Sequence, residues 1–314
     1  MKPIKCNTRY DKTIWAGKRL AQIRGQQEKA GLSWDVGFHH SAPLTIDGGE
    51  FDGQLLINVV TEHPEMLGDK TLNQALRMCI LNADEALSIQ VHPNDDYALE
   101  HDNDLGKTES WYVIEAQEGA SIVAGVKTCD PDEVRQAIEE DRLMDLVREI
   151  PVREGDYIKI PYGTLHALGK GIMCAEVGTN SDTTYRFFDY HRKDANGNER
   201  PLHIEKSFDV AHFENQPNIK HFSLAKKDAT TIMQVERCNE YYVNLVDVVN
   251  EYNLTPNGHT FFIITAVKND LEIECENEKN ELKYTESVFV PANCSKLTIR
   301  GEGRLMISYS NRKN

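Results

Sequence analysis

The residues best suited to chemistry lie in three short segments of the 314-residue chain. The first reads Leu-Ser-Ile-Gln-Val-His-Pro, and alternation along a strand places its Gln90 and His92 on one face, about 7 Å apart. The second reads Lys-Thr-Glu, so Lys107 and Glu109 also share a face. The third ends at His166, just after a turn that contains glycine. Together these segments predict a mixed oxygen and imidazole site for zinc or another borderline divalent cation, formed by Gln90, His92, Glu109 and His166.

Each of these residues also has an ordinary structural explanation. A single histidine in a strand is more often a hydrogen-bonded core or surface group than a ligand, and Glu109 could simply be solvated. The order and spacing of the four residues are far more specific than any one of them.

The elements that must position these residues are short strands, and strand-like signals dominate the chain. Runs rich in Val, Ile, Phe and Tyr, bounded by Gly, Pro, Asn or Asp, occur at residues 86–91, 110–115, 157–160, 260–267, 287–290 and 305–309. Helices are expected at residues 131–150, where Asp130 is the N-cap and Pro131 takes the first helical position, and at residues 71–80. Many short strands and few helices predict an antiparallel sandwich or barrel.

A weak internal similarity suggests two related β-barrels. Residues 155–161 and 285–291 each read as an acidic turn, an apolar strand and a closing proline. His166 comes five residues after Pro161, whereas Lys296 comes five residues after Pro291. We therefore expect a metal in the first barrel and none in the second.

The order of these motifs resembles that of the type I mannose-6-phosphate isomerases, also called phosphomannose isomerases, in their short bacterial form. The matching motifs are Gln-Val-His-Pro from Gln90, Lys-Thr-Glu up to Glu109 and Gly-Thr-Leu-His up to His166. A later segment, Ser-Asp-Thr-Thr-Tyr-Arg up to Arg186, also matches, with Glu176 ten positions before that arginine. The similarity is faint after residue 215. In the family these motifs supply four protein ligands to one zinc, which implies one Zn²⁺ per chain, held by Gln90, His92, Glu109 and His166.

The resemblance also implies the fold and the domain division. We expect a mainly β fold of two cupin-type jelly-roll barrels with a small added helical section. Residues 1–215 would form the metal-binding catalytic cupin domain with helical insertions, and residues 216–314 a second, metal-free cupin-like barrel.

The activity that the resemblance implies is metal-dependent aldose–ketose isomerisation of mannose 6-phosphate and fructose 6-phosphate through an enediol intermediate. A proton moves between C2 and C1 of the open-chain sugar, and a divalent cation stabilises the charge that develops on the two oxygens. The candidate catalytic residues are Arg186, Lys107, Glu176 and Asp182.

Each catalytic candidate has more than one interpretation. Arg186 could stabilise the enediolate, hold the phosphate, or form a structural ion pair with Asp182 or Asp189. Lys107 could transfer a proton or clamp a phosphate or hydroxyl group. Glu176 and Asp182 are candidates for the general base or for orienting sugar hydroxyls, and one of them could only hold Arg186. The sequence does not assign the base.

Other functions are compatible with parts of the pattern. The chain has Ser-Trp-Asp-Val-Gly at residues 33–37, where the family usually has Ser-Trp-Glu, so another phosphosugar is a possible substrate. A non-catalytic sugar-binding cupin would not require Lys107, Glu176, Asp182 and Arg186 together. A cupin dioxygenase could use His92, Glu109 and His166 as two histidines and a carboxylate around iron. Gln90 and the wider resemblance favour zinc.

Composition limits the partners. A net charge of −15 argues against nucleic acid and anionic membrane surfaces as partners. A small phosphorylated sugar is still compatible with this charge, if a few basic residues gather at its binding site. The seven cysteines are scattered and odd in number, and the first 20 residues contain no apolar run, so we expect a cytoplasmic protein. The adjacent His39 and His40 are expected in a solvated loop. The oligomeric state is left open.

Overall fold

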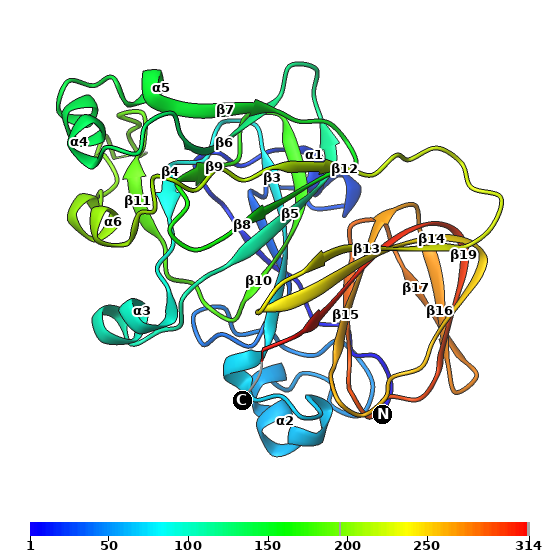
Figure 1. The fold of residues 1–314 in the computed structure, drawn as a ribbon. Helices are drawn as coiled ribbons and strands as arrows, with labels where there is room; N and C mark the ends of the chain where they lie inside the picture. The colour runs from blue at the N-terminus through cyan, green and yellow to red at the C-terminus, as the bar shows by residue number, and fades with distance from the viewer. Residues whose placement is uncertain (195, 313–314) are drawn as a thin grey trace.

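Three antiparallel sheets with short peripheral helices make up the computed structural model, which describes residues 1–194 and 196–312 (Figure 1). The first sheet contains, in spatial order, β1 (Arg9–Asp11), β2 (Leu32–Val36), β3 (Leu76–Ala83), β10 (Ile172–Thr179), β5 (Glu109–Ala116), β8 (Asp156–Ile160) and β12 (Ile219–His221). The second contains β11 (Tyr185–Phe188), β4 (Ile89–Val91), β9 (His166–Ala167), β6 (Ser121–Val126) and β7 (Val147–Pro151).

The third sheet is formed by the C-terminal part of the chain and lies beside the first two (Figure 1, yellow to red). Its strands are β13 (Thr231–Arg237), β14 (Tyr241–Leu254), β19 (Leu297–Ser310), β15 (Phe262–Lys268) and β18 (Ser287–Val290), with β16 (Leu271–Cys275) paired to β19 and β17 (Glu278–Leu282) paired to β16. Each of the six predicted strand segments overlaps an observed strand, namely β4, β5, β8, β15, β18 and β19.

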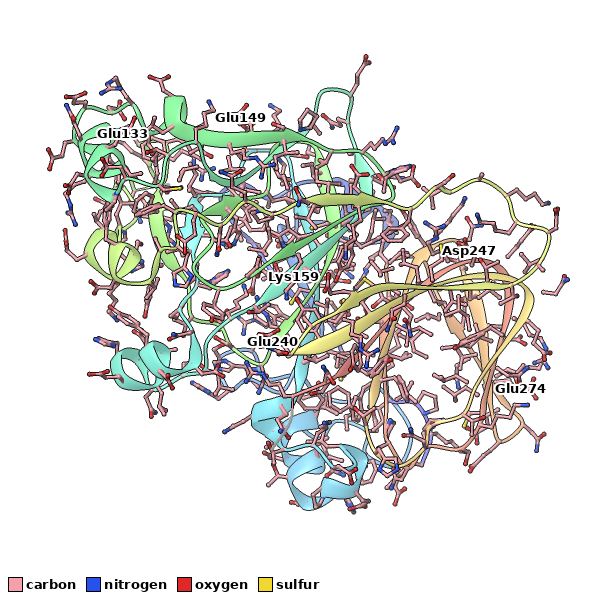
Figure 2. All side chains as sticks on the ribbon, in the orientation of Figure 1. Glu133, Glu149, Lys159, Glu240, Asp247 and Glu274 are labelled. Atoms are coloured by element: carbon pink, nitrogen blue, oxygen red, sulfur yellow. The ribbon has the colours of Figure 1, made fainter. Side chains whose placement is uncertain are left out.

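The helices are short. They are α1 (Arg19–Ile23), α2 (Leu56–Glu62), α3 (Asp95–Asp102), α4 (Pro131–Glu139), α5 (Leu143–Leu146) and α6 (Ile204–Val210), with 3₁₀ turns η1 (Pro64–Met66) and η2 (Leu72–Gln74). Within the described ranges, none of them has the length and apolar character that a membrane crossing requires. Carboxylates such as Glu133 and Glu149 lie on exposed positions of the surface (Figure 2).

The helix predicted at residues 71–80 is wrong. A real capping box at Thr71 and Gln74 begins only the turn η2, and the chain then enters β3. All eight residues of β3 are buried, and the strand pairs with β2 on one side and β10 on the other. A strand covered on both faces reads as a continuous apolar run, which periodicity alone does not distinguish from a buried helix.

The helix predicted at residues 131–150 begins as expected but ends early. Asp130 Oδ1 accepts a hydrogen bond from the Asp132 backbone N–H at 2.9 Å, and Pro131 is the first helical residue. The helix ends at Glu139, and Asp141 adopts a left-handed φ of 56°. After the single turn α5 the chain forms β7, where Ile150 pairs with Ile122 of β6. Pairing at the sheet edge overrides the helical spacing of the last apolar residues.

The main core joins the first sheet to the third. It includes Trp111 and Tyr157 from the first sheet with Tyr241 and Phe289 from the third. The buried Arg304 on β19 donates to Asp247 Oδ1 at 2.6 Å and to the Tyr112 hydroxyl at 3.1 Å, so it crosses the same boundary. The predicted division between residues 215 and 216 stays a prediction, and β12, just beyond it, pairs with β8.

Candidate metal centre and active site

Three of the predicted metal ligands gather between the first two sheets. Glu109 is the first residue of β5, His92 follows β4, and His166 begins β9, where it pairs with Gln90 of β4. The ligand atoms of His92, Glu109 and His166 all lie within 4.8 Å of one another. The three residues are buried, with exposed fractions of 1%, 0% and 0%.

Both histidines are oriented by backbone carbonyls. His92 Nδ1 lies 2.9 Å from the Thr183 carbonyl oxygen, and His166 Nδ1 lies 2.8 Å from that of Thr164. A carbonyl only accepts, so each Nδ1–H donates and leaves the Nε2 lone pair free. The Nε2 atoms then face Glu109, at 3.4 Å from Oε2 for His92 and 3.3 Å from Oε1 for His166.

This arrangement fits a bound divalent cation. His92 Nε2 and both carboxylate oxygens of Glu109 are buried without a hydrogen-bond partner, although Lys107 Nζ forms an ion pair with Oε2 at 2.6 Å. Buried lone pairs that point at one another are costly unless a cation lies among them. Two neutral imidazoles and one carboxylate are a donor set that borderline metals prefer. These three residues could therefore hold a metal ion.

Gln90 is the fourth predicted ligand and lies at the edge of this cluster. Its side-chain Nε2 is 3.3 Å from His166 Nε2. The nitrogen and oxygen of an amide exchange places by a flip about the last side-chain bond, so the carbonyl oxygen can take the same position. Gln90 is half-buried, whereas the other three are fully enclosed.

The electrostatic surroundings favour the forms of His92 and Glu109 that could bind a metal. Burial, followed by the charge of Lys107, lowers the pKa of His92 to about 3, so its imidazole is neutral. Burial alone would raise the pKa of Glu109, but the charge of Lys107 and contacts with His92 hold it well below its usual value. His92 thus presents a neutral nitrogen and Glu109 an anionic oxygen at neutral pH.

The lowered pKa of His92 predicts a pH-dependent stability of the metal-free protein. As pH decreases below about 6.5, the unfolded chain binds a proton at His92 that the folded chain refuses until about pH 3. The free energy of unfolding should therefore decrease by about 1.4 kcal/mol per pH unit in that window because of this residue. Denaturant unfolding with a chelator present, at several pH values, measures the slope. His92→Gln should lack this contribution, and equal slopes would show that His92 is not held neutral.

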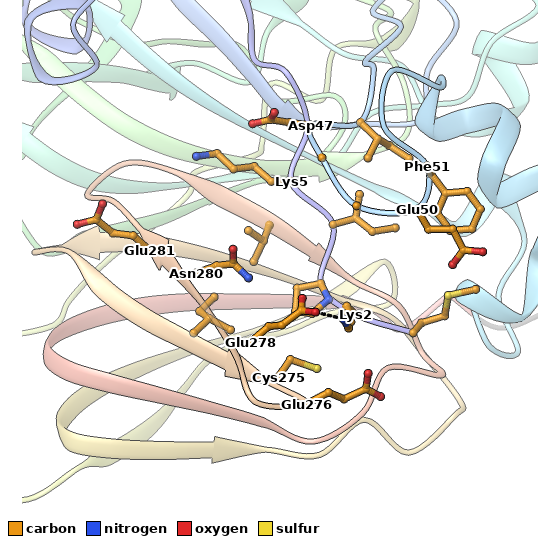
Figure 3. A pocket seen from close by; sticks show the side chains of 18 residues that line it. Lys2, Lys5, Asp47, Glu50, Phe51, Cys275, Glu276, Glu278, Asn280 and Glu281 are labelled. Carbon is orange, nitrogen blue, oxygen red and sulfur yellow. Dashed lines mark hydrogen bonds and ion pairs between the residues drawn. The ribbon is translucent and has the colours of Figure 1, made fainter.

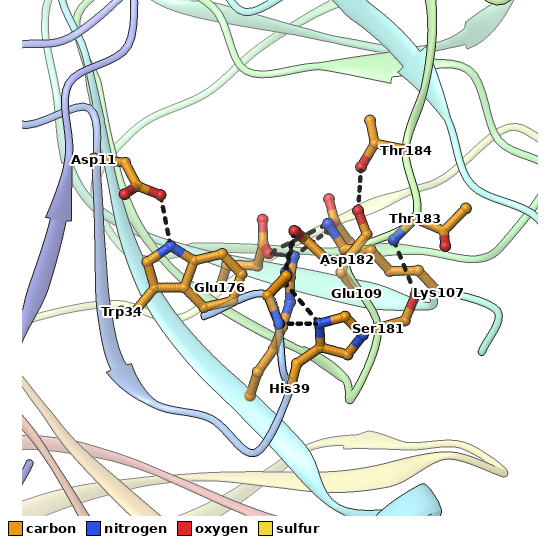
Figure 4. A network of polar contacts seen from close by, with 12 residues as sticks. Asp11, Trp34, His39, Lys107, Glu109, Glu176, Ser181, Asp182, Thr183 and Thr184 are labelled. Atoms are coloured by element: carbon orange, nitrogen blue, oxygen red, sulfur yellow. Dashed lines mark hydrogen bonds and ion pairs between the residues drawn. The ribbon is translucent and has the colours of Figure 1, made fainter. Parts of the chain in front are cut away.

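A buried arginine that the sequence analysis did not identify lies beside this cluster. Arg77 Nη2 is 2.5 Å from Glu176 Oε1 and 4.0 Å from Glu109 Oε2, and Nη1 is 3.4 Å from Asp182 Oδ1. Its guanidinium also lies 4.9 Å from the ring centre of Trp34. Figure 4 shows its partners Glu176, Asp182 and Glu109 near Trp34. The structure thus brings Glu176 and Asp182 together through Arg77.

Gly178 lies between Arg77 and Glu109 in the first sheet. This residue of β10 pairs with Arg77 of β3 on one side and with Glu109 of β5 on the other. A Cβ at this position would make ordinary contacts, at 3.4 Å from Arg77 Nε and 3.6 Å from the Cβ of Glu109. The pairing places Arg77 and Glu109 at the same level of the sheet, one strand apart on either side of β10.

Glu176 is held from three directions. In addition to Arg77, it accepts a hydrogen bond from Trp111 Nε1 at 3.2 Å and lies 3.5 Å from Lys107 Nζ. Lys107 is therefore shared between Glu109 and Glu176. Arg77 and Lys107 thus link Glu109 and Glu176 in one buried network of ion pairs.

Arg186 differs from Arg77 in its partners. It lies on β11 directly opposite Gln90, and its Nη1 donates to the Pro201 carbonyl oxygen at 2.8 Å. Its Nε is buried without a hydrogen-bond partner, and burial, then the charge of Arg200, lowers the pKa of its guanidinium. The two carboxylates considered as ion-pair partners bind other groups: Asp182 binds Arg77 and Ser41, and Asp189 binds Arg192 and Arg200.

Access from solvent lies on the side of Gln90, Arg186 and Asp182. The first two side chains are half-buried, and that of Asp182 is 44% exposed. A separate cavity of about 710 Å³ lies between the N-terminal segment, residues 46–51 and the β16–β17 hairpin (Figure 3). None of the predicted site residues lines it. A smaller cavity of about 280 Å³ reaches Lys107, beside Asp95 and Arg312.

Known proteins resemble this chain over nearly its whole length. A family model described as phosphomannose isomerase type I, catalytic domain, matches residues 6–119, and one described as mannose-6-phosphate isomerase, cupin domain, matches residues 230–310. A mannose-6-phosphate isomerase from Streptococcus mutans is 33% identical over 315 residues, covering 98% of both chains.

Solved structures show the same similarity. The mannose 6-phosphate isomerase from Bacillus subtilis matches with a TM-score of 0.89 and 31% identity, over 98% of this chain and 99% of that one. A variant of the phosphomannose isomerase from Salmonella typhimurium matches with a TM-score of 0.77 over 99% of this chain and 100% of that one, but at 14% identity it supports the fold alone. The predicted mainly β, cupin-type fold is confirmed.

Proposed function

Because this chain belongs to the type I mannose-6-phosphate isomerase family, we propose that its buried cluster of His92, Glu109 and His166 holds one zinc ion, with Gln90 as a fourth ligand. The chain catalyses the family's reaction, the aldose–ketose interconversion of mannose 6-phosphate and fructose 6-phosphate. The observation that supports the zinc site most is the convergence of His92 Nε2 and His166 Nε2 on the buried carboxylate of Glu109, at 3.4 Å and 3.3 Å from its oxygens.

The chemistry proposed for the site follows from the charge that develops in the reaction. Bound zinc would supply positive charge beside the sugar oxygens that become negative in the enediolate. The Arg186 guanidinium forms no ion pair with a carboxylate among the described residues, so we assign it to the substrate, where it binds the enediolate oxygen or the phosphate.

The remaining charged residues divide by exposure. Glu176 is buried and held by Arg77, Trp111 and Lys107. Its role is therefore to hold the two basic side chains in place rather than to take a proton. Asp182 is the carboxylate open to solvent and therefore the one able to contact sugar hydroxyls. Proton transfer between C2 and C1 falls to Asp182, or to Lys107, which is buried but lines a cavity of about 280 Å³.

An acidic protein needs a local positive field to bind a phosphorylated sugar. Arg186, Arg192 and Arg200 lie close together, and Asp189 neutralises only part of their charge. This cluster supports a small anionic substrate. The exclusion of nucleic acid and membranes and the cytoplasmic location stay predictions.

A coupled assay for fructose 6-phosphate formed from mannose 6-phosphate tests the proposal. We expect turnover that a chelator abolishes and zinc restores. If the metal-bound protein acted only on another phosphosugar, the proposed metal site would stand and the proposed substrate would be wrong. Iron in the protein as isolated, with a colour change under O₂, would indicate a dioxygenase and contradict the isomerase.

A further inference from the structure

His39 is not the solvated histidine that the sequence suggested. Its neighbour His40 is exposed, but the side chain of His39 is buried, with 7% of the residue exposed. His39 Nε2 lies 3.0 Å from Asp104 Oδ1, and Nδ1 lies 2.8 Å from the hydroxyl of Ser41. Because a carboxylate only accepts, the Nε2–H of His39 donates to Asp104.

Asp104 joins His39 to the segment at residues 181–184. Its Oδ2 accepts hydrogen bonds from the Thr183 hydroxyl at 2.7 Å and from the Asp182 backbone N–H at 3.2 Å. Its Oδ1 also accepts from the Leu105 backbone N–H at 2.7 Å. Burial would raise the pKa of Asp104, but the bonds from His39 and Thr183 lower it, so the carboxylate is charged. A charged acceptor bound by several donors is a rigid anchor.

The anchored segment carries two parts of the active site. The Thr183 carbonyl accepts the Nδ1–H of His92 at 2.9 Å and so fixes the ring of a proposed metal ligand. The Asp182 carboxylate accepts from the Ser41 hydroxyl at 2.9 Å and faces Arg77 at 3.4 Å. Figure 4 shows His39, Ser181, Asp182 and Thr183 grouped beside Lys107 and Glu109.

We propose that His39 is a positioning residue, which fixes Asp104 and thereby the segment at residues 181–184, so that the Thr183 carbonyl holds His92 in its metal-binding orientation. This inference rests on the proposed metal site. His39 reaches the metal ligand through Asp104 and Thr183, each link being a hydrogen bond of 3.0 Å or less. Ser41, which lies 2.8 Å from His39 Nδ1 and donates to Asp182, contacts the same segment. Partners at this distance from a metal tune ligand orientation and thereby affinity.

Two substitutions of His39 test the proposal. His39→Phe removes the donor to Asp104, and we expect it to lower zinc affinity about tenfold to a hundredfold. Activity should decrease in proportion when zinc is limiting. At saturating zinc the KM for the sugar should change little. His39→Gln keeps an N–H near the place of Nε2 and should recover most of the affinity. His40→Gln changes the exposed neighbour and should match the wild type. Competition with a chromophoric chelator measures the affinity.

The result that overturns the proposal is folded His39→Phe protein with zinc affinity within twofold of the wild type. Thr183→Val provides a second test if His39→Phe does not fold, because it removes only the hydroxyl that donates to Asp104. It too should weaken zinc binding, and unchanged affinity would overturn the proposal. If the wild-type protein bound zinc but did not act on mannose 6-phosphate, only the proposed reaction would be contradicted. The zinc affinities of the His39 variants and the wild type could still be compared, so the positioning role would still be tested.

Discussion

Replacing His166 with alanine is expected to remove the metal and to lower kcat/KM for mannose 6-phosphate at least about a thousandfold. His166 is fully buried, and its Nε2 is one of the converging donors that face Glu109. Alanine offers no donor, and the remaining carboxylate and imidazole leave an incomplete coordination shell. The metal content of the purified variant tests the loss of metal, and the coupled assay tests the decrease in kcat/KM.

A matched control is available on the surface. His101 lies on α3, is exposed and stacks on Tyr97, so His101→Ala should keep both metal and activity. Far-UV circular dichroism of the His166 variant tests whether it is folded. A folded variant that retained stoichiometric zinc and most of its turnover would exclude His166 as a ligand.

Arg186→Ala should lower kcat/KM about a hundredfold to a thousandfold while leaving the metal bound. The guanidinium pairs with no carboxylate among the described residues, so its removal leaves no buried charge unpaired and costs little stability. Its loss removes charge that the account assigns to the enediolate or the phosphate. A decrease confined to kcat points to the enediolate, whereas a higher KM points to the phosphate.

Arg148 provides the control for this substitution. It is also half-buried, and its Nη1 donates to a backbone carbonyl, that of Pro217, at 2.9 Å. Arg148→Ala removes a similar bond on β7, which β6 separates from the strand that carries His166, and should leave kcat and KM unchanged. Equal, small effects of both substitutions would mean that Arg186 has only a structural role.

The geometry that sequence alone could predict is that of residues two positions apart in one extended segment, whereas the meeting of the three segments rested on their order and spacing. Alternation predicts that Gln90 and His92 share a face and that Lys107 and Glu109 do, and the structure places Lys107 Nζ 2.6 Å from Glu109. Side-chain direction along a strand depends only on local geometry, so a few neighbouring residues are sufficient to infer it.

The parts that sequence reasoning missed depend on partners far along the chain. Arg77 and Glu176 are 99 residues apart, and His39 and Asp104 are 65 apart. One signal was available for Arg77, because a charged residue inside an apolar run needs a partner if the run is buried. The incorrect helix at residues 71–80 concealed it, since an arginine on a helix can point to solvent. His39 had no comparable local signal.

Titration of zinc into chelator-treated protein is the most direct measurement of the central claim, that one buried metal at His92, Glu109 and His166 is required for isomerisation. The account predicts no turnover of mannose 6-phosphate at the start, a linear rise with added zinc, and saturation at one equivalent per chain. Full turnover in the absence of metal, or turnover that is unaffected by the first equivalent of zinc, would contradict it.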